Sequence, residues 1–177
     1  MYSQLEELLA AGKWREANRE TKIILREIAR ENINLKSVSY STVPLGKIPV
    51  QVLCDIDSLW AKYSNNHFGF SSQKRVWDKF YIDRHNRIST YHAFIKAIGW
   101  YDYSSDSCGY YNYETSSTKN VEKENPNVFS LEAPQGHLPM FTDWDINSID
   151  DYFQRGALDG IAQDIFDFFA RIPQVKE

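Results

Sequence analysis

Two stretches of the chain repeat apolar residues at helical spacing, and they constrain the fold more than any other feature. In residues 13–31 the inward positions are Trp14, Ala17, Thr21, Ile24, Leu25 and Ile28. Towards the other end, the same spacing is followed by Ile161, Ile165, Phe168, Phe169 and Ile172, and Pro173 closes the segment. No long stretch alternates apolar and polar residues as a strand does. The sequence therefore predicts an all-α domain.

Four shorter segments also predict helices, each with a candidate start or stop. Residues 3–11 are followed by Gly12, which is typical of a helix C-terminus and would make a helical hairpin with residues 13–31. Candidate N-caps of the other three helices are Asp55, then Ser71 or Ser72, then Ser89. The last of these helices is expected to end at Gly99.

Three stretches without periodicity predict loops: residues 32–50, 101–128 and 134–147. Residues 101–128 are rich in Tyr, Ser, Asp, Asn and Lys, and we expect a long polar loop with a hairpin as an alternative for part of it. We therefore expect residues 1–177 to form one domain. Its predicted architecture is an irregular, mainly helical bundle of six to seven helices in which two long loops form a ligand cleft.

Composition and charge exclude several classes of function. The net charge is −4 without a dense Lys/Arg stripe, which argues against nucleic-acid binding. No apolar run approaches the ~18–20 residues of a membrane span, and the N-terminal residues MYSQLEE do not look like a signal peptide, so we expect a cytoplasmic location. The two cysteines, Cys54 and Cys108, have no metal-ligand spacing. No nucleophile with a positioned base is recognisable, and we therefore expect a non-enzymatic protein.

Aromatic residues make up 15% of the chain, with five Trp, eleven Tyr and ten Phe. Most of these rings are expected to fill the core, but their number also suggests recognition of a flat ligand. Two segments of the chain are distinctive, residues 54–77 (CDIDSLWAKYSNNHFGFSSQKRVW) and residues 130–139 (SLEAPQGHLP), and the first of them contains five of these rings.

These two segments resemble the genomes-uncoupled-four family, the tetrapyrrole-binding regulators of magnesium chelatase. The matching residues of the first segment are Asp55, Asp57, Leu59, Trp60, Tyr63, Ser64, Phe68, Gly69, Phe70, Ser71 and Gln73. Those of the second are Ala133, Pro134, Gly136, His137, Leu138 and Pro139, and an N-terminal motif is matched by Trp14, Ala17 and Thr21. The resemblance spans roughly residues 3–145.

The resemblance implies a helical domain shaped like a cupped hand, without a catalytic centre. Members bind porphyrins, and some relatives bind linear bilins, in a groove between two loops. The implied partners are the tetrapyrrole itself and either the large subunit of magnesium chelatase or fused signalling domains.

The residues support such a site on chemical grounds, because a tetrapyrrole needs an apolar, ring-lined cleft with a few polar anchors. The predicted ligand-binding residues are Phe68, Phe70, Gln73, Arg75, Trp100, Tyr101, His137, Leu138, Pro139, Phe141, Asp143 and Asp145. Gly69 would allow close backbone approach between its two Phe neighbours, and Arg75 could bind a propionate.

Structural alternatives remain open for several of these residues. Phe68 and Phe70 fit the core as well as a site, and Trp60 and Trp77 favour the core. The His137 ring could form a hydrogen bond with loop backbone, and Lys74 and Arg75 could lie on a solvent-exposed helix face. Cys108 is expected to be an ordinary loop thiol, with covalent attachment of a bilin as the alternative.

One departure from the family pattern bears on the ligand. Chelatase regulators carry Asn and Arg after the His-Leu-Pro motif, whereas residues 140–145 here are MFTDWD. A carboxylate repels propionates but accepts hydrogen bonds from pyrrole N–H groups. We therefore expect a linear bilin such as biliverdin or phycocyanobilin, held non-covalently, with Asp143 or Asp145 at its nitrogens. The alternatives are a porphyrin or magnesium-porphyrin, or an interaction module that has lost its ligand.

Overall fold

The computed structural model describes residues 2–32, 46, 48–81, 87–102, 109–110, 127–140 and 158–172, and they form a mainly helical domain. The helices are α1 (Ser3–Ala10), α2 (Trp14–Asn32), α3 (Val50–Ser64), α4 (Phe70–Phe80), α5 (Arg87–Ala97) and α8 (Leu158–Arg171). Two short strands, β1 (Tyr101–Asp102) and β2 (Gly109–Tyr110), pair antiparallel. The all-α prediction is confirmed, and the hairpin alternative is confirmed at the start of residues 101–128.

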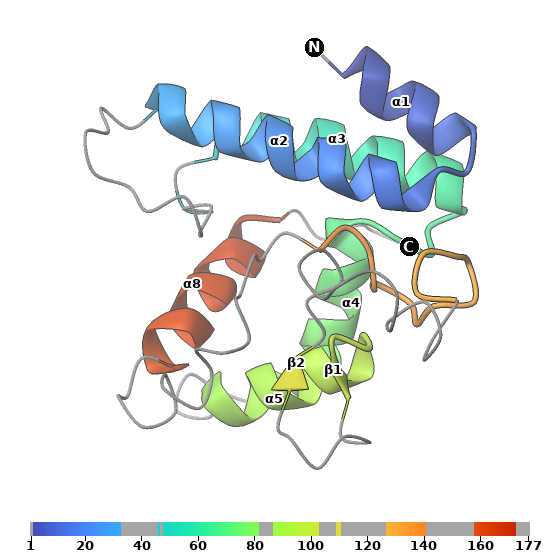
Figure 1. The fold of residues 1–177 in the computed structure, drawn as a ribbon. Helices are drawn as coiled ribbons and strands as arrows, with labels where there is room; N and C mark the ends of the chain where they lie inside the picture. Colours follow the sequence, from blue (N-terminus) through green and yellow to red (C-terminus); the bar gives the residue numbers. More distant parts are fainter. Residues whose placement is uncertain are drawn as a thin grey trace.

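The helices form two layers (Figure 1). In the upper layer α2 and α3 run alongside each other, and the indole Nε1 of Trp60 donates a 3.0 Å hydrogen bond to Oγ1 of Thr21 between them. Helix α1 is tied to α3 by Glu6, which accepts hydrogen bonds from Lys62 and Tyr63. The lower layer consists of α4, α5 and α8, which contact one another.

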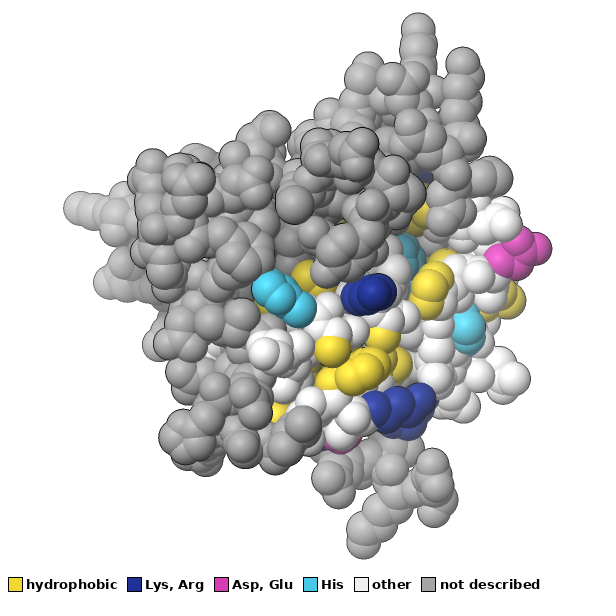
Figure 2. Space-filling model, turned by 90° about the horizontal axis from the view of Figure 1, so that it is seen from below, with side chains coloured by type: hydrophobic (Ala, Val, Ile, Leu, Met, Phe, Trp, Pro, Cys, Tyr) yellow, Lys and Arg dark blue, Asp and Glu magenta, His cyan; other side chains and the backbone are white. Residues whose placement is uncertain are grey.

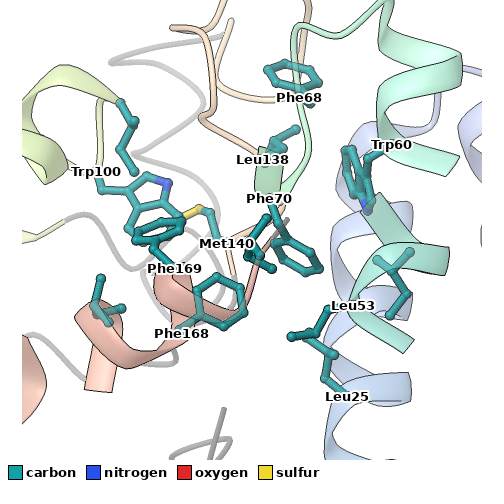
Figure 3. Packing of buried hydrophobic residues seen from close by; sticks show 14 of the residues in the cluster. Leu25, Leu53, Trp60, Phe68, Phe70, Trp100, Leu138, Met140, Phe168 and Phe169 are labelled. Carbon is teal, nitrogen blue, oxygen red and sulfur yellow. The ribbon is translucent and has the colours of Figure 1, made fainter. Parts of the chain in front are cut away.

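The core runs through both layers and is dominated by rings (Figure 3). In the upper layer, Phe68 packs edge-on against Trp14 and Trp60, at centroid distances of 5.6 and 6.2 Å. In the lower layer, Trp77 lies 5.2 Å from Phe169, so the expectation that Trp60 and Trp77 belong to the core is confirmed.

The glycine residues predicted the C-terminal ends of helices correctly, whereas the polar residues did not predict the N-terminal ends. Gly12 (φ +66°) and Gly99 (φ +74°) adopt the left-handed conformation just after α1 and α5, as predicted. All the predicted N-caps are wrong. Helix α3 begins at Val50, so residue 50 is not loop and Asp55 lies inside the helix. The serines lie inside their helices too, because α4 begins at Phe70 and α5 at Arg87.

The predicted C-terminal helix is confirmed, and Ile165, Phe168, Phe169 and Ile172 are buried as the spacing indicated. Residues 127–140 form turns without a helix, in agreement with the irregular stretch predicted from Pro134. Asn32, predicted to be in a loop, belongs to α2. The remaining loop predictions fall on residues 33–45, 47, 103–108, 111–126 and 141–147, outside the described residues. Within the described helices, none is both long and apolar enough to cross a membrane.

Candidate functional site

The two sequence motifs meet in space and are joined by four hydrogen bonds, and we call residues 67–73 together with 133–140 the motif joint. The backbone N–H of Gly69 donates to Leu138 O (2.9 Å), and that of Gly136 donates to His67 O (2.9 Å). The Gln73 side-chain Nε2 donates to Pro139 O (2.8 Å), and the His67 ring Nε2 lies 2.7 Å from the carbonyl oxygen of Ala133. Segments 66 residues apart in the chain therefore form one hydrogen-bonded unit.

Close backbone approach explains both glycines of the joint. Gly136 (φ +76°) packs against Gln73, and a Cβ at this position would lie 3.2 Å from the Gln73 Cα. Gly69 (φ +110°) packs against α3, where a Cβ would lie 2.6 Å from Oδ1 of Asp57. An added Cβ would press on the other motif segment at Gly136 and on α3 at Gly69.

Asp57 reaches the joint from α3. Its Oδ1 accepts hydrogen bonds from the backbone N–H and the hydroxyl of Ser71, at 2.9 and 3.1 Å. Burial raises the pKa of the Asp57 carboxyl, and the hydrogen bonds from Ser71 and Phe70 together with the charge of Arg75 only partly offset this. The carboxylate acts as the N-cap that the predicted serines do not supply, because it satisfies an N–H of the first turn of α4.

The second motif segment is also anchored to α5 and α2. Trp100, just after α5, donates its indole N–H to His137 O at 2.7 Å, and the His137 Nδ1–H donates to Ile98 O at 2.7 Å. Burial lowers the pKa of His137 to about 4, so the imidazole is neutral at neutral pH. At the end of the segment, the backbone N–H of Met140 donates to Oδ1 of Asn18 at 2.7 Å. The backbone-bonding alternative for His137 is confirmed.

The predicted open slot between aromatic residues is not present in the described part of the chain. The side chains with at most 2% exposure include Phe68, Phe70, Gln73, Trp100, His137 and Leu138. Leu138 lies between Phe68 and Phe70, whose rings turn to opposite layers (Figure 3). The slot is closed because the rings pack on other rings while hydrogen bonds join the two segments. Whether any of these residues touches a ligand stays a prediction.

The remaining predicted site residues lie elsewhere or outside the described residues. Arg75 donates from Nη2 to Asn66 O at 3.0 Å, and its neighbour Lys74 forms an ion pair with Asp78 at 2.8 Å. Pro139 is buried at the joint. Phe141, Asp143, Asp145, Cys108 and the side chain of Tyr101 lie outside the described residues. Among the described residues, no three His, Cys, Asp or Glu side chains are grouped as a metal site.

One polar atom of the joint is buried without a donor among the described residues. Gln73 is fully buried, and its Oε1 has no hydrogen-bond partner within the described ranges. A buried acceptor without a partner costs about 1–3 kcal/mol, so an N–H donor that reached it would be favoured. The pyrrole N–H groups of a tetrapyrrole are donors of this kind.

Two residues that contact the joint, Asn18 and Asp57, were not among the predicted site residues, although each carried a signal. Asn18 and Lys22 are buried polar residues on α2, with exposures of 1% and 5%. They follow Trp14 at intervals of four, so the helical spacing already placed them on the inward face. Asp57 was noted as a motif match, but its capping role requires a contact between two helices that spacing does not reveal.

A groove of about 690 Å³ lies away from the motif joint, between α1 and α3. Its lining residues are Tyr2, Ser3, Glu6, Glu7, Ala10, Asp55, Ser58, Leu59 and Tyr63. Three carboxylates line it, so it would repel a pigment that carries propionates. On another side of the molecule, Figure 2 shows hydrophobic side chains gathered next to basic ones, with acidic side chains only at the edge of its described part.

Two curated relatives match most of the chain. The protein ycf53 of Cyanidium caldarium is 33% identical over 142 residues, which cover 79% of this chain and 50% of the relative. A protein of Arabidopsis thaliana named "Tetrapyrrole-binding protein, chloroplastic" is 28% identical over 141 residues, covering 79% of this chain and 48% of that protein. The chain thus spans about half the length of these curated relatives.

Solved structures show the same fold. The structure of GUN4 from Chlamydomonas reinhardtii matches with a TM-score of 0.53 and 28% identity, over 79% of each chain. The ligand-free structure of Arabidopsis thaliana GUN4 matches with a TM-score of 0.56 and 22% identity, over 94% of this chain and 93% of that one, and supports the fold alone.

The family model described as GUN4-like matches residues 1–155, which include both motif segments and the helices that position them. The resemblance to the genomes-uncoupled-four family, stated above from the motifs, is therefore confirmed. On this match and on the ycf53 relative, the chain belongs to the GUN4-like family.

Proposed function

We propose that this chain is a non-enzymatic domain that binds a tetrapyrrole. The observation that carries the proposal is the family match over residues 1–155, which contains both segments of the motif joint. The Arabidopsis relative is named as a tetrapyrrole-binding protein, and this chain aligns with 48% of it.

In this proposal the motif joint supports the pigment from behind. Its hydrogen bonds fix Pro139 and Met140, and the next residue in the chain is Phe141, the first of the predicted contacts that follow the joint. Met140 is anchored to Asn18, one helical turn from the buried Lys22 on α2. The pigment would lie against Phe141, with propionates directed to a cation such as Arg75.

We further propose that the preferred pigment is a linear bilin, either biliverdin or phycocyanobilin. Support comes from Asp143 and Asp145, which stand where chelatase regulators are expected to carry Asn and Arg. A carboxylate at this point accepts hydrogen bonds from the pyrrole nitrogens of a protonated bilin. Because it is negatively charged, it also disfavours a ligand whose propionates approach it.

Two other functions have observations in their favour. A porphyrin or magnesium-porphyrin ligand, with the large subunit of magnesium chelatase as partner, is what the family resemblance implies. An interaction module that has lost its ligand is favoured by the closed packing of Phe68, Phe70 and Trp100. Fused signalling domains would be further partners of a bilin-binding form.

Absorbance titrations test the proposal and separate these alternatives. The purified chain is titrated with biliverdin, phycocyanobilin, protoporphyrin and magnesium-protoporphyrin. We expect a red-shifted, sharpened bilin band, because a clamped chromophore loses conformers, and weaker binding of both porphyrins. Porphyrins that bind as tightly as bilins would remove the bilin preference. No spectral change with any of the four pigments would contradict tetrapyrrole binding.

The double variant Asp143→Asn, Asp145→Asn tests the contact with the pyrrole nitrogens. We expect it to weaken bilin binding and shift the bound spectrum, because an amide carries no charge to match a protonated bilin. The matched control is Asp78→Asn on α4, whose carboxylate pairs with Lys74. A double variant with the wild-type bilin spectrum would remove these carboxylates from the site.

A further inference from the structure

We propose that Asp57 is the positioning residue of the binding segments: from α3, its carboxylate fixes where both halves of the motif joint lie. The inference rests on the proposed function in so far as the joint serves a ligand. The carboxylate of Asp57 binds Ser71, and it would act on a ligand through the residues that it holds in place.

Helix α4 lacks a cap of its own, which makes the contact with Asp57 decisive. Its N-cap residue is Gly69, which has no side chain, and its first turn contains no acidic residue. The positive end of the α4 dipole and the N–H of Ser71 are therefore satisfied from another helix. Asp57 meets Ser71 through two hydrogen bonds to the same oxygen, which restricts the position of the α4 N-terminus more than a single bond would.

Gly69 transmits this position to the second motif segment. One side of Gly69 faces Asp57 so closely that a Cβ would lie 2.6 Å from Oδ1. On its backbone, the N–H of Gly69 donates to Leu138 O at 2.9 Å. Asp57, Gly69 and Leu138 thus form a continuous series of contacts from α3 to the segment that ends at Met140.

The position of Gly69 also affects the packing of both layers, because its two neighbours in the chain belong to different layers. Phe68 packs into the upper layer, 6.2 Å from Trp60, and Phe70 packs into the lower layer, 5.4 Å from Phe168. A shift of Gly69 would therefore disturb ring packing in both layers, as well as the joint.

Asp57 can serve as a reference point because α3 is itself held firmly. Its neighbours Ile56 and Trp60 are fully buried, and Trp60 is hydrogen-bonded to Thr21 of α2. The carboxylate projects from this fixed helix onto the first turn of α4, which has no side-chain cap from its own residues. We infer that loss of this carboxylate loosens the joint while the helices stay in place.

Pigment titration of Asp57 variants tests the inference. We expect Asp57→Ala to weaken bilin binding about tenfold, the equivalent of about 1.4 kcal/mol, and to broaden the bound absorption band. Asp57→Asn should stay within about threefold of wild type with a sharp band, because its amide oxygen still accepts from Ser71. The matched control is Asp55→Ala on the same helix, whose carboxylate bonds to the exposed Gln51.

The band shape separates positioning from a general loss of stability. A variant that is only less stable would bind less pigment per molecule, but the bound pigment would keep the wild-type spectrum. Gly69→Ala provides a second route to the same result, since its Cβ would push against Asp57, and it should also broaden the band. An Asp57→Ala protein with wild-type affinity and a sharp band would overturn the inference.

If the wild type binds none of the pigments, the proposed function is contradicted but the positioning role of Asp57 is not. Amide hydrogen exchange then tests that role without a ligand. In ligand-free protein, Asp57→Ala should speed exchange at Gly69 and Gly136 at least tenfold relative to Asp55→Ala, because both N–H groups bond across the joint. Unchanged exchange at these two positions would refute the positioning role whatever the ligand.

Discussion

The motif joint and the lower aromatic cluster lie side by side, but they are held together by different forces. The cluster comprises Trp77, Phe94, Phe168 and Phe169, with ring centroids 5.2–5.4 Å apart, and Phe70 of the joint packs against it. The joint is crossed by directional hydrogen bonds that involve backbone groups of both segments. Apolar contact is tolerant of small shifts, whereas a hydrogen bond requires its distance and angle. The comparison indicates that the cluster supplies stability and the joint supplies geometry.

The largest effect should come from the cluster. Phe168 is fully buried, and its ring meets Phe70 and Phe169, so Phe168→Ala leaves a cavity. We expect a loss of about 3–5 kcal/mol in the free energy of unfolding, measured by denaturant titration. Phe168→Leu, the control, should lose less because it keeps most of the apolar volume. A loss under about 1 kcal/mol for the alanine variant would contradict the assignment of stability to the cluster.

The joint should differ from the cluster in its response to pH. Folding lowers the pKa of His137 from 6.5 to about 4, so the unfolded chain takes up a proton that the folded chain refuses. The stability contributed by neutral His137 is therefore present above about pH 6.5 and lost as the pH falls towards about 4, by roughly 3 kcal/mol. The measurement is the unfolding free energy of wild type minus that of His137→Gln across this range. A difference that stays constant with pH would contradict it.

The pH dependence that Asp57 contributes to the unfolding free energy has the opposite sign to that of His137. The two contributions are therefore separated by measuring a variant of each residue. Its folded pKa is raised, so it favours the folded state at low pH, and that contribution is lost as the pH rises through the raised pKa. Asp57→Asn should therefore remove a fall in stability with rising pH, whereas His137→Gln should remove a rise.

Close approach at Gly69 can be separated from backbone strain. Gly69→Ala and Gly12→Ala both place a Cβ at positive φ, but only at Gly69 does the Cβ meet an atom, Asp57 Oδ1 at 2.6 Å. We expect Gly12→Ala to cost about 1–2 kcal/mol, from backbone strain. Gly69→Ala should cost roughly 1–3 kcal/mol more, because packed atoms must shift. Equal losses of stability in the two variants, measured by thermal unfolding, would mean that the joint accommodates an added methyl group at no extra cost.

The smallest effect concerns a single hydrogen bond. Gln73→Met keeps the length of the side chain but leaves Pro139 O without its buried donor, a cost of about 1–3 kcal/mol that removal of the unpartnered Oε1 partly offsets. The control is Gln163→Met on α8, where an exposed bond to Asp167 is lost, with a cost of about 0.5 kcal/mol or less. Similar losses from the two changes would mean that burial adds nothing to the joint.

The sequence predicts the cluster better than the joint, and the reason is physical. Helical spacing alone indicates that Phe168 and Phe169 face inward, because period and burial are coupled along one helix. Glycine stops after α1 and α5 were also readable, since left-handed backbone favours glycine. The predicted serine caps failed because a helix N-terminus can be satisfied from a distant element, as Asp57 does for α4.

The site was harder to predict because its residues act across long separations. The motifs identified the right segments, but they could not show that Gly69 bonds to Leu138 or that Gln73 bonds to Pro139. From sequence alone, an aromatic residue in a motif is as consistent with the core as with a binding site. Phe68, Phe70 and Trp100 lie in the core. Asn18 was overlooked because a polar residue on an apolar stripe has no partner visible in sequence.

Amide hydrogen exchange of the ligand-free wild type shows whether the two motif segments form one rigid unit before any ligand binds. We expect the N–H groups of Gly69, Gly136 and Met140 to exchange slowly and together, at rates close to those of buried α3 amides, because all three are hydrogen-bonded across or beside the joint. Fast exchange at these three positions beside a protected α3 would show two independent loops, and would contradict the account.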